Sequence, residues 1–357
     1  MPTIDSDAHV VESERTWDFM EPSEQKYRPL LVAPKGEHGR EYWLIDGKVR
    51  GLARQVVTAK QYAEISKLAG REMGTEQDTR DMENVEARLK HMDALGVDQQ
   101  VLYGTIFIEE VADTPEWEVP IYWGFNRWMA HIWKQAPTRL PWIAAAAFSS
   151  IPDALDQIRY SKENGAVGVF FRGVEGNRLI QDPYFDPIYD EMERLNLVVG
   201  LHIGNSNPWM VNLLSQRNGG GTFWKFRLAS VGAFHGIIMN GLPERFPKLR
   251  FHFAEAAAGW IPYTLKDLRR RLAPRGRKLP ENPMKEWRLY VSCESDDDME
   301  YIISKCGDEN LVIGTDYGHN DQSTEIEALR NLEKSGTVPA ASYRKIVHDN
   351  AKTLFAL

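Results

Sequence analysis

The chain has 357 residues, of which 43% are hydrophobic, and this length allows one large domain or two smaller ones. The formal net charge of −8 lacks the basic excess of a nucleic-acid-binding protein, so no nucleic-acid partner is expected. No stretch approaches the roughly 18 uninterrupted apolar residues of a membrane-spanning helix, so no membrane span is expected either.

The cysteine content and the N-terminus bear on location. Cys293 and Cys306 are too few for a disulfide scaffold and too far apart for a CxxC metal site. The N-terminus has no basic segment followed by an apolar run, so no signal peptide is expected. These features predict a reduced, cytoplasmic setting.

Eight short apolar runs bounded by turn residues predict β-strands along the chain. In chain order they are residues 3–10, 99–104, 142–149, 166–172, 197–204, 249–256, 288–294 and 311–316. Amphipathic helical segments separate them; residues 79–96, for example, carry apolar side chains at a spacing near 3.6 and stop at Gly96. Eight alternating strands and helices predict an α/β fold of the (β/α)8 TIM-barrel type. A doubly wound open sheet is the alternative, but no GxGxxG motif follows the first strand.

Two long segments interrupt this rhythm within the single domain expected for residues 1–357. Residues 12–80 contain an Asp46-Gly47 pair between alternating residues, which predicts a hairpin turn. We interpret this segment as an insertion after the first strand that covers the barrel mouth as a lid. Residues 205–227 are rich in Gly, Asn and Trp and predict a long active-site loop.

Acids and histidines stand at the C-terminal ends of four predicted strands: Asp7 with His9, then His202, Glu255 and Asp316. In a barrel these ends open on one face, where catalytic groups gather. Strand alternation places Asp7 and His9 on the same side. Imidazole nitrogen and carboxylate oxygen together suit Zn²⁺, Mn²⁺ or Fe²⁺. The pattern favours a metal site over five separate polar residues hydrogen-bonded to neighbouring loops.

The same alternation orients several neighbouring polar residues. It places Asp5 on the barrel side, one step deeper than Asp7, where we expect it to support the site or to be hydrogen-bonded. It turns Glu255 toward the barrel and His252 toward the helices. Glu12 follows the strand end, where it would meet either substrate or solvent.

Several motifs together resemble one known group of enzymes. They are "IDSDAHVVE", "HMDALGVDQQVL", "GAVGVFF", "DPYFDPIYDEMERLNLVVGLHIG", "NGLPERFPKLRFHFAEAAAGWIPY", "IGTDYGHND" and "KIVHDNAKTLFAL", and they run nearly from end to end. The sequence resembles the amidohydrolase superfamily, in particular its branch of metal-dependent hydrolases and non-oxidative decarboxylases. That branch includes aminocarboxymuconate semialdehyde decarboxylase and γ-resorcylate decarboxylase.

The resemblance implies one divalent metal ion, with zinc as the first choice and manganese or iron as alternatives. Matched residue by residue, its ligands are Asp7, His9, His202 and Asp316. The first-strand motif of the superfamily is often His-x-His, and Asp7 replaces its leading histidine. Superfamily members with two metals use a carboxylated lysine at the end of strand 4, where this chain has Arg172, so a single ion is expected.

The implied reaction is the non-oxidative decarboxylation of a small aromatic or unsaturated carboxylate. The alternative is hydrolysis of an amide, ester or lactone by a metal-activated water. The decarboxylases have a histidine on strand 6, where this chain has Glu255. We expect Asp316, Glu255 and His202 to be the catalytic residues, with Asp316 or Glu255 transferring the proton and Glu255 alternatively becoming an extra ligand.

Three further residues are candidates for contact with a small-molecule substrate. Arg172 would hold a substrate carboxylate or, equally, pair with Glu175 or another acid at the barrel mouth. His319 would orient Asp316, touch substrate or cap the following helix. Trp209, near the barrel mouth, suits a planar hydrophobic substrate. The resemblance also implies a homodimer or a higher homo-oligomer.

Overall fold

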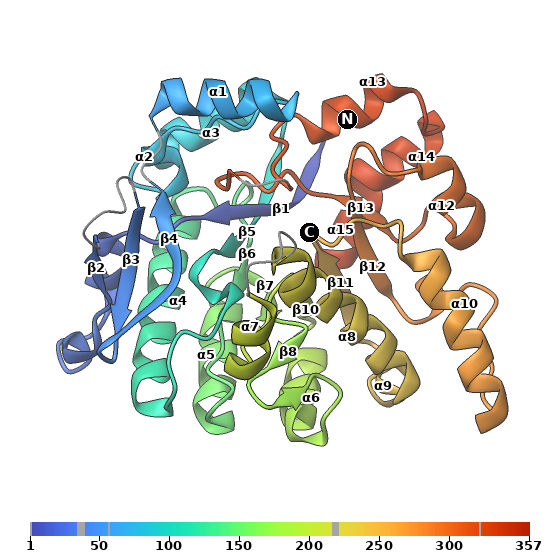
Figure 1. The fold of residues 1–357 in the computed structure, drawn as a ribbon, viewed down its shortest axis with the longest axis horizontal. Coiled ribbons are helices and arrows are strands. Elements are labelled where there is room, and N and C mark those ends of the chain that lie inside the picture. The colour runs from blue at the N-terminus through green and yellow to red at the C-terminus, as the bar shows by residue number, and fades with distance from the viewer. Residues whose placement is uncertain (1, 34–39, 56–57, 216–220, 321–322) are drawn as a thin grey trace.

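The computed structural model describes residues 2–33, 40–55, 58–215, 221–320 and 323–357. Its main sheet has eight parallel strands in the order β1-β5-β6-β7-β10-β11-β12-β13 (Figure 1). They are β1 Ile4–Val10, β5 Gln99–Gly104, β6 Trp142–Ala144, β7 Ala166–Phe171, β10 Val198–His202, β11 Arg250–Ala254, β12 Leu289–Cys293 and β13 Leu311–Ile313. Each predicted strand is present, and helices lie between them, so the predicted (β/α)8 barrel is confirmed. The third and eighth strands are shorter than predicted.

The barrel closes between β1 and the residues that follow β13. Ala8 forms a parallel bridge with Tyr317, and the backbone N–H of Asp316 donates to the carbonyl of Asp7 at 2.9 Å. A Cβ atom at Gly314 would lie 2.3 Å from the Cβ of Asp7, so this approach requires glycine. Closure therefore brings the first and last predicted site carboxylates together.

The helices of the barrel bury apolar side chains against the strands. They are α3 Val85–Leu95, α4 Pro115–Gln135, α5 Ile151–Glu163, α6 Asp186–Arg194, α8 Leu228–Met239, α10 Ile261–Leu272, α12 Met299–Cys306, α13 Ala328–Ser335, α14 Ala340–Arg344 and α15 Asn350–Phe355, with short α2 Gln77–Arg80, α9 Leu242–Arg245 and α11 Pro283–Glu286. Helix α3 ends at Gly96, whose φ of 74° is left-handed, as the sequence predicts. Among the described helices, none has the length and apolarity to cross a membrane.

The segment between β1 and α3 forms a small antiparallel sheet and one helix. The sheet consists of β2 Leu30–Val32, β3 Arg40–Ile45 and β4 Lys48–Gln55, and α1 Ala59–Ala69 follows it. Asp46 and Gly47 have φ values of 49° and 67°, which are those of the two-residue turn predicted for this pair. Figure 1 shows this sheet to one side of the barrel strands and α1 at the edge of the molecule. A lid function for residues 12–80 stays a prediction.

The predicted long loop after β10 is largely helical, which corrects the sequence interpretation. It contains α7 Pro208–Leu214 and the π-helical turn η5 Phe223–Arg227, while residues 216–220 lie outside the described residues. The side chain of Asn207 accepts a hydrogen bond from the Met210 N–H at 2.8 Å. An Asn cap followed by Pro is a helix-start signal that the Gly- and Asn-rich composition obscured.

The close approach at Gly314 generates the first prediction. We expect Gly314→Ala to lower the free energy of unfolding by about 1–3 kcal/mol, because the added methyl group meets the buried Asp7 side chain. The matched control is Gly232→Ala within α8, where a Cβ would meet nothing within 4 Å. Urea unfolding measures both variants, and equal stabilities would contradict the packing argument.

Candidate metal centre

Four of the predicted residues meet at the C-terminal end of the barrel. The Nε2 atoms of His9 and His202 lie 2.9 Å apart. Asp7 Oδ1 lies 3.7 Å from His9 Nε2 and 3.6 Å from His202 Nε2, and Asp316 Oδ1 lies 3.7 Å from His9 Nε2. All four side chains are buried. The structure therefore brings together the residues that the sequence predicts as ligands.

These residues fit a divalent ion. Two atoms bound to one ion at about 2.1 Å each lie no more than about 4.2 Å apart, and the distances that join Asp7, His9 and His202 respect that limit. Asp316 meets the limit with His9 and groups with His9, Glu255 and His319. Among the described residues no group donates a hydrogen bond to the buried Asp7 Oδ1. A buried carboxylate oxygen without such a donor is costly. A bound cation would remove that cost.

The hydrogen bonds of the two histidines orient them as metal ligands. His202 Nδ1 lies 2.9 Å from the carbonyl of Ile203, so this nitrogen carries a proton, and Nε2 is the nitrogen left to bind a metal ion when the ring is neutral. The Thr105 hydroxyl donates to the Val10 carbonyl at 2.8 Å, which leaves its oxygen to accept from His9 Nδ1 at 3.4 Å. Both Nε2 atoms are therefore directed at the centre of the cluster.

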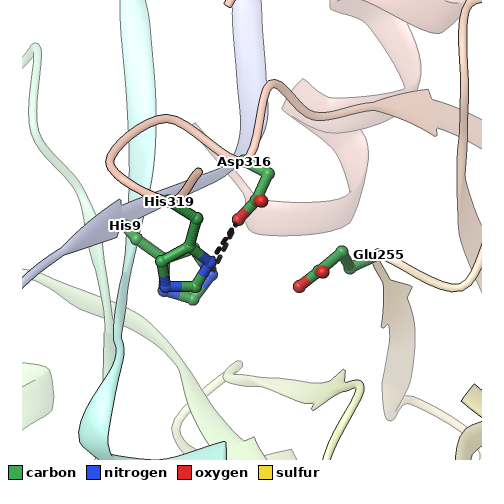
Figure 2. A group of neighbouring side chains, drawn as sticks. All are labelled: His9, Glu255, Asp316 and His319. Atoms are coloured by element: carbon green, nitrogen blue, oxygen red, sulfur yellow. Dashed lines mark ion pairs between the residues drawn. The ribbon is translucent and has the colours of Figure 1, made fainter. Parts of the chain in front are cut away.

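Glu255 joins the cluster from the end of β11. Its Oε2 lies 3.0 Å from His202 Nε2, and Figure 2 shows its carboxylate directed toward His9 and His319. One ligand atom each from His9, Glu255, Asp316 and His319 lies within 4.8 Å of the others. Glu255 is thus close enough to be either a further ligand or a proton-transfer group.

The expected orientation of His252 was wrong. His252 Nδ1 lies 2.8 Å from the Tyr103 hydroxyl and its Nε2 lies 2.8 Å from Ser292 Oγ, while the Tyr103 ring packs near His202 inside the barrel. Strand alternation holds only up to the end of β11 at Ala254. Glu255 has a φ of 60°, and this left-handed turn redirects its side chain into the barrel.

His319 contacts Asp316 rather than capping a helix. Its Nδ1 lies 2.7 Å from Asp316 Oδ1, drawn as a dashed line in Figure 2, and its ring stacks on that of His9 with centroids 3.9 Å apart. Its Nε2 lies 3.0 Å from the Thr105 hydroxyl, and Thr324 donates to Asp316 Oδ2 at 2.8 Å. Asp316 has a φ of 50°, so these contacts hold a strained residue in place.

Burial and neighbouring charges shift the acid–base equilibria of the cluster. Burial raises the pKa of Asp7 to about 7, against the opposing charge of His202. Burial lowers the pKa of His202, but the Asp7 and Glu255 carboxylates outweigh burial and raise it to about 9. Burial and the charges of His319 and His202 hold the pKa of His9 well below its ordinary value. Burial raises the pKa of Glu255, but its contact with His202 and the charges of His202 and His319 together outweigh burial, and the net shift is downward.

The other two substrate-binding candidates lie outside the cluster. Arg172 is buried at the end of β7, where its guanidinium donates to the Glu175 carboxylate at 2.5 Å, the Tyr122 hydroxyl at 2.9 Å and the Phe107 carbonyl. Of the two alternatives for Arg172, the structure shows the pair with Glu175. Trp209 is 69% exposed on α7.

Two acids near the chain start have structural partners. Asp5 accepts hydrogen bonds from Thr315 Oγ1 at 2.5 Å and Gln100 Nε2 at 2.9 Å, as expected for a buried group. Glu12 is buried, and its carboxylate accepts from the backbone N–H groups of Thr105 at 3.0 Å and Ile106 at 3.1 Å. Glu12 therefore holds the loop after β5, and the expectation that it meets substrate or solvent was wrong.

Sequence reasoning missed two supporting residues. Arg88 is fully buried and donates to the carbonyl of His9 at 3.2 Å. It lies three residues after Val85 and four before Met92 on the apolar face of α3, and a cation on that face was a readable signal. Thr105 directly follows a predicted strand, the position in which the other site residues were sought.

Two cavities adjoin the cluster. A void of about 20 Å³ lies beside it, lined by Asp7, Glu255, Ser292, Cys293, Glu294, Gly314, Asp316 and Ser323. A cleft of about 920 Å³ shares Glu294 and Ser323 with this void and extends between α1, η5 and the loops after β12 and β13. The void suits an ion or a water molecule, and the cleft suits a substrate.

The pKa shifts predict how the stability of the metal-free protein depends on pH. His202 has its pKa raised from 6.5 to about 9, so its contribution to stability is complete below pH 6.5 and is lost as pH rises through 9. The pKa of Asp7 is raised from 3.8 to about 7, so its contribution to stability is complete below pH 3.8 and is lost as pH rises through 7. We expect the Tm of chelator-treated protein to fall between pH 6.5 and 9, and Asp7→Asn to flatten that fall. A wild-type Tm that rises across this range would contradict the proposed charge coupling.

The fold matches several solved structures at low sequence identity. An amidohydrolase from Mycobacterium avium subsp. paratuberculosis K-10 is 16% identical, with a TM-score of 0.79 over 99% of both chains. A 2,6-dihydroxybenzoate decarboxylase from Rhizobium is 16% identical, with a TM-score of 0.67 over 100% of this chain and 99% of that chain. A 5-carboxyvanillate decarboxylase from Novosphingobium aromaticivorans, complexed with manganese and 4-hydroxy-3-methoxy-5-nitrobenzoic acid, is 16% identical, with a TM-score of 0.68 over 100% of this chain and 96% of that chain. Residues 4–357 match the amidohydrolase family. The chain therefore belongs to the amidohydrolase family, as its motifs predict.

Proposed function

We propose that this protein is a metal-dependent decarboxylase of a small aromatic or unsaturated carboxylate. The observation that carries the proposal is the buried Asp7 Oδ1, which lies within 3.7 Å of the Nε2 atoms of His9 and His202 and accepts no hydrogen bond from the described residues. An enzyme that buries this set of groups needs a cation among them.

Asp7, His9, His202 and Asp316 would hold the ion. Imidazole nitrogens and carboxylate oxygens support zinc as the first choice, with manganese or iron as alternatives. When bound, the ion would attract the substrate carboxylate and an adjacent hydroxyl and offset the negative charge that gathers there. His9, the histidine of the first-strand motif, is held by Thr105 and by the stacked His319 ring.

The reaction requires a proton from the protein. The bond between the ring carbon and the carboxylate breaks, CO₂ leaves with no bonding electrons from that bond, and the ring carbon keeps the pair and takes up a proton. We assign delivery of this proton to Asp316. Its Oδ1 faces the cluster, and His319 Nδ1, 2.7 Å away, is placed to return a proton to it.

The substrate class is supported by the solved structures that share this fold. Two of them are decarboxylases of 2,6-dihydroxybenzoate and 5-carboxyvanillate, both aromatic carboxylates. The proposed enzyme has a homodimeric or higher assembly, works in the cytoplasm and uses residues 12–80 as its lid.

A second candidate function is metal-dependent hydrolysis of an amide, ester or lactone. The ion pair with His202 holds the pKa of Glu255 below its ordinary value. An ionised carboxylate beside the cluster suits a base that takes a proton from an attacking water.

The assignment of Asp316 generates a kinetic prediction. We expect Asp316→Asn to lower kcat for CO₂ release by at least about 100-fold, because the amide cannot transfer the proton. The matched control is Asp190→Asn at an exposed position of α6, which should keep full activity. The assay follows CO₂ release from a panel of hydroxybenzoates and acid release from a panel of lactones. Full activity of Asp316→Asn would refute its assigned role.

Glu255→Gln separates the two functions. If the protein is a decarboxylase with Asp316 as proton donor, we expect this variant to keep at least about one-tenth of the CO₂ release. If the protein is a hydrolase with Glu255 as base, acid release from its lactone substrate should fall by about 100-fold or more. Acid release without any CO₂ release by the wild-type protein would establish the second candidate.

A further inference from the structure

The size difference between the two cavities at the site limits how a substrate can lie. The void beside Asp7, Glu255 and Asp316 measures about 20 Å³, which leaves room for little more than an ion or a water molecule. The adjoining cleft measures about 920 Å³, near the upper end of the roughly 300–1,000 Å³ typical of drug-sized ligands. A single-ring carboxylate would leave most of this cleft empty.

One arginine of the cleft contacts the residues that also line the void at the site. Arg227, in the π-helical turn η5, donates through Nη2 to Glu294 Oε1 at 2.8 Å and to Ser323 Oγ at 2.8 Å. Glu294 and Ser323 are the two residues that line both the cleft and the void. Three other cavities, of about 490, 370 and 560 Å³, share no lining residue with the void. The cleft is therefore the described cavity that leads to the cluster.

Part of the cleft lining is apolar. It contains Ile65, Leu68, Ala69, Met73 and Phe223. Leu68 is 89% exposed and Phe223 is 53% exposed, so both have apolar surface to cover when a ligand binds. An apolar ligand group that covers such surface gains affinity.

The charged groups of the cleft cancel. Arg71, Arg227, Glu294 and Asp296 all line the cleft, so the lining carries two cationic and two anionic side chains. A net charge on the part of the ligand in the cleft would meet no excess of the opposite sign. The anionic part of the substrate belongs at the metal centre, and the remainder is neutral.

We propose that the substrate carries a neutral apolar extension beyond its reacting ring, equal in size to at least a second fused ring, and that Phe223 and Leu68 bind this extension. The inference rests on the proposed function for the carboxylate end alone. The extension is inferred from the cleft, so binding measurements test it separately from turnover.

The test compares two carboxylates that differ by one ring. 2-Hydroxybenzoate and 1-hydroxy-2-naphthoate present the same carboxylate and adjacent hydroxyl, and titration calorimetry on the full-length, metal-loaded protein measures the Kd of each. We expect the naphthoate to bind at least tenfold more tightly. Phe223→Ala and Leu68→Ser should each weaken naphthoate binding at least fivefold and change benzoate binding less than twofold. Leu179→Ser, at a 55% exposed position on β9 Arg178–Leu179, is the matched control and should change neither.

The outcomes separate this inference from the proposed function. Tight, Phe223-dependent naphthoate binding without CO₂ release supports the extension and refutes decarboxylation. CO₂ release from 2-hydroxybenzoate with no gain in affinity for the naphthoate supports decarboxylation and refutes the extension. Equal Kd values, or failure of the naphthoate to bind, overturn the inference. A changed elution volume of Phe223→Ala in size-exclusion chromatography also overturns it, since a second copy of the chain would then cover this part of the lining.

Discussion

The burial of the Asp7 carboxylate is the constraint on which the rest of the site depends. Its Oδ1 lies 3.7 Å from His9 Nε2 and 3.6 Å from His202 Nε2 and accepts no hydrogen bond from the described residues. Such a group is tolerated when a cation neutralises it. Barrel closure at Gly314 and Asp316 holds this carboxylate in place, so the same contacts that complete the fold also assemble the metal centre.

Two strained residues finish the cluster. Glu255 directly follows β11, and Asp316 lies three residues after the end of β13. Both have positive φ values, of 60° and 50°. Residues other than glycine adopt this conformation at a cost, and such strain concentrates at functional sites. Here the left-handed turns direct both carboxylates toward the histidines, which regular strand geometry would not do.

Much of the fold and of the ligand set could be predicted from sequence. Buried parallel strands appear as continuous apolar runs, and the residues at their ends, such as His202, meet on one face whatever the helices between them do. Side-chain direction beyond a strand end could not be predicted, because it depends on a single backbone torsion; His252 was misplaced for this reason. Arg172 had two plausible partners, and only the packed structure distinguishes Glu175 from a ligand.

Metal stoichiometry tests the central claim most directly. Mass spectrometry of the protein after expression with added zinc, manganese or iron should find about one divalent ion per chain, as expected for a single mononuclear centre. His9→Ala and His202→Ala should each lose the ion, while His235→Ala, at a half-buried position of α8 paired with Asp267, should keep it. Less than about one-third of an ion per wild-type chain, or full metal content in the His9 and His202 variants, would contradict the account.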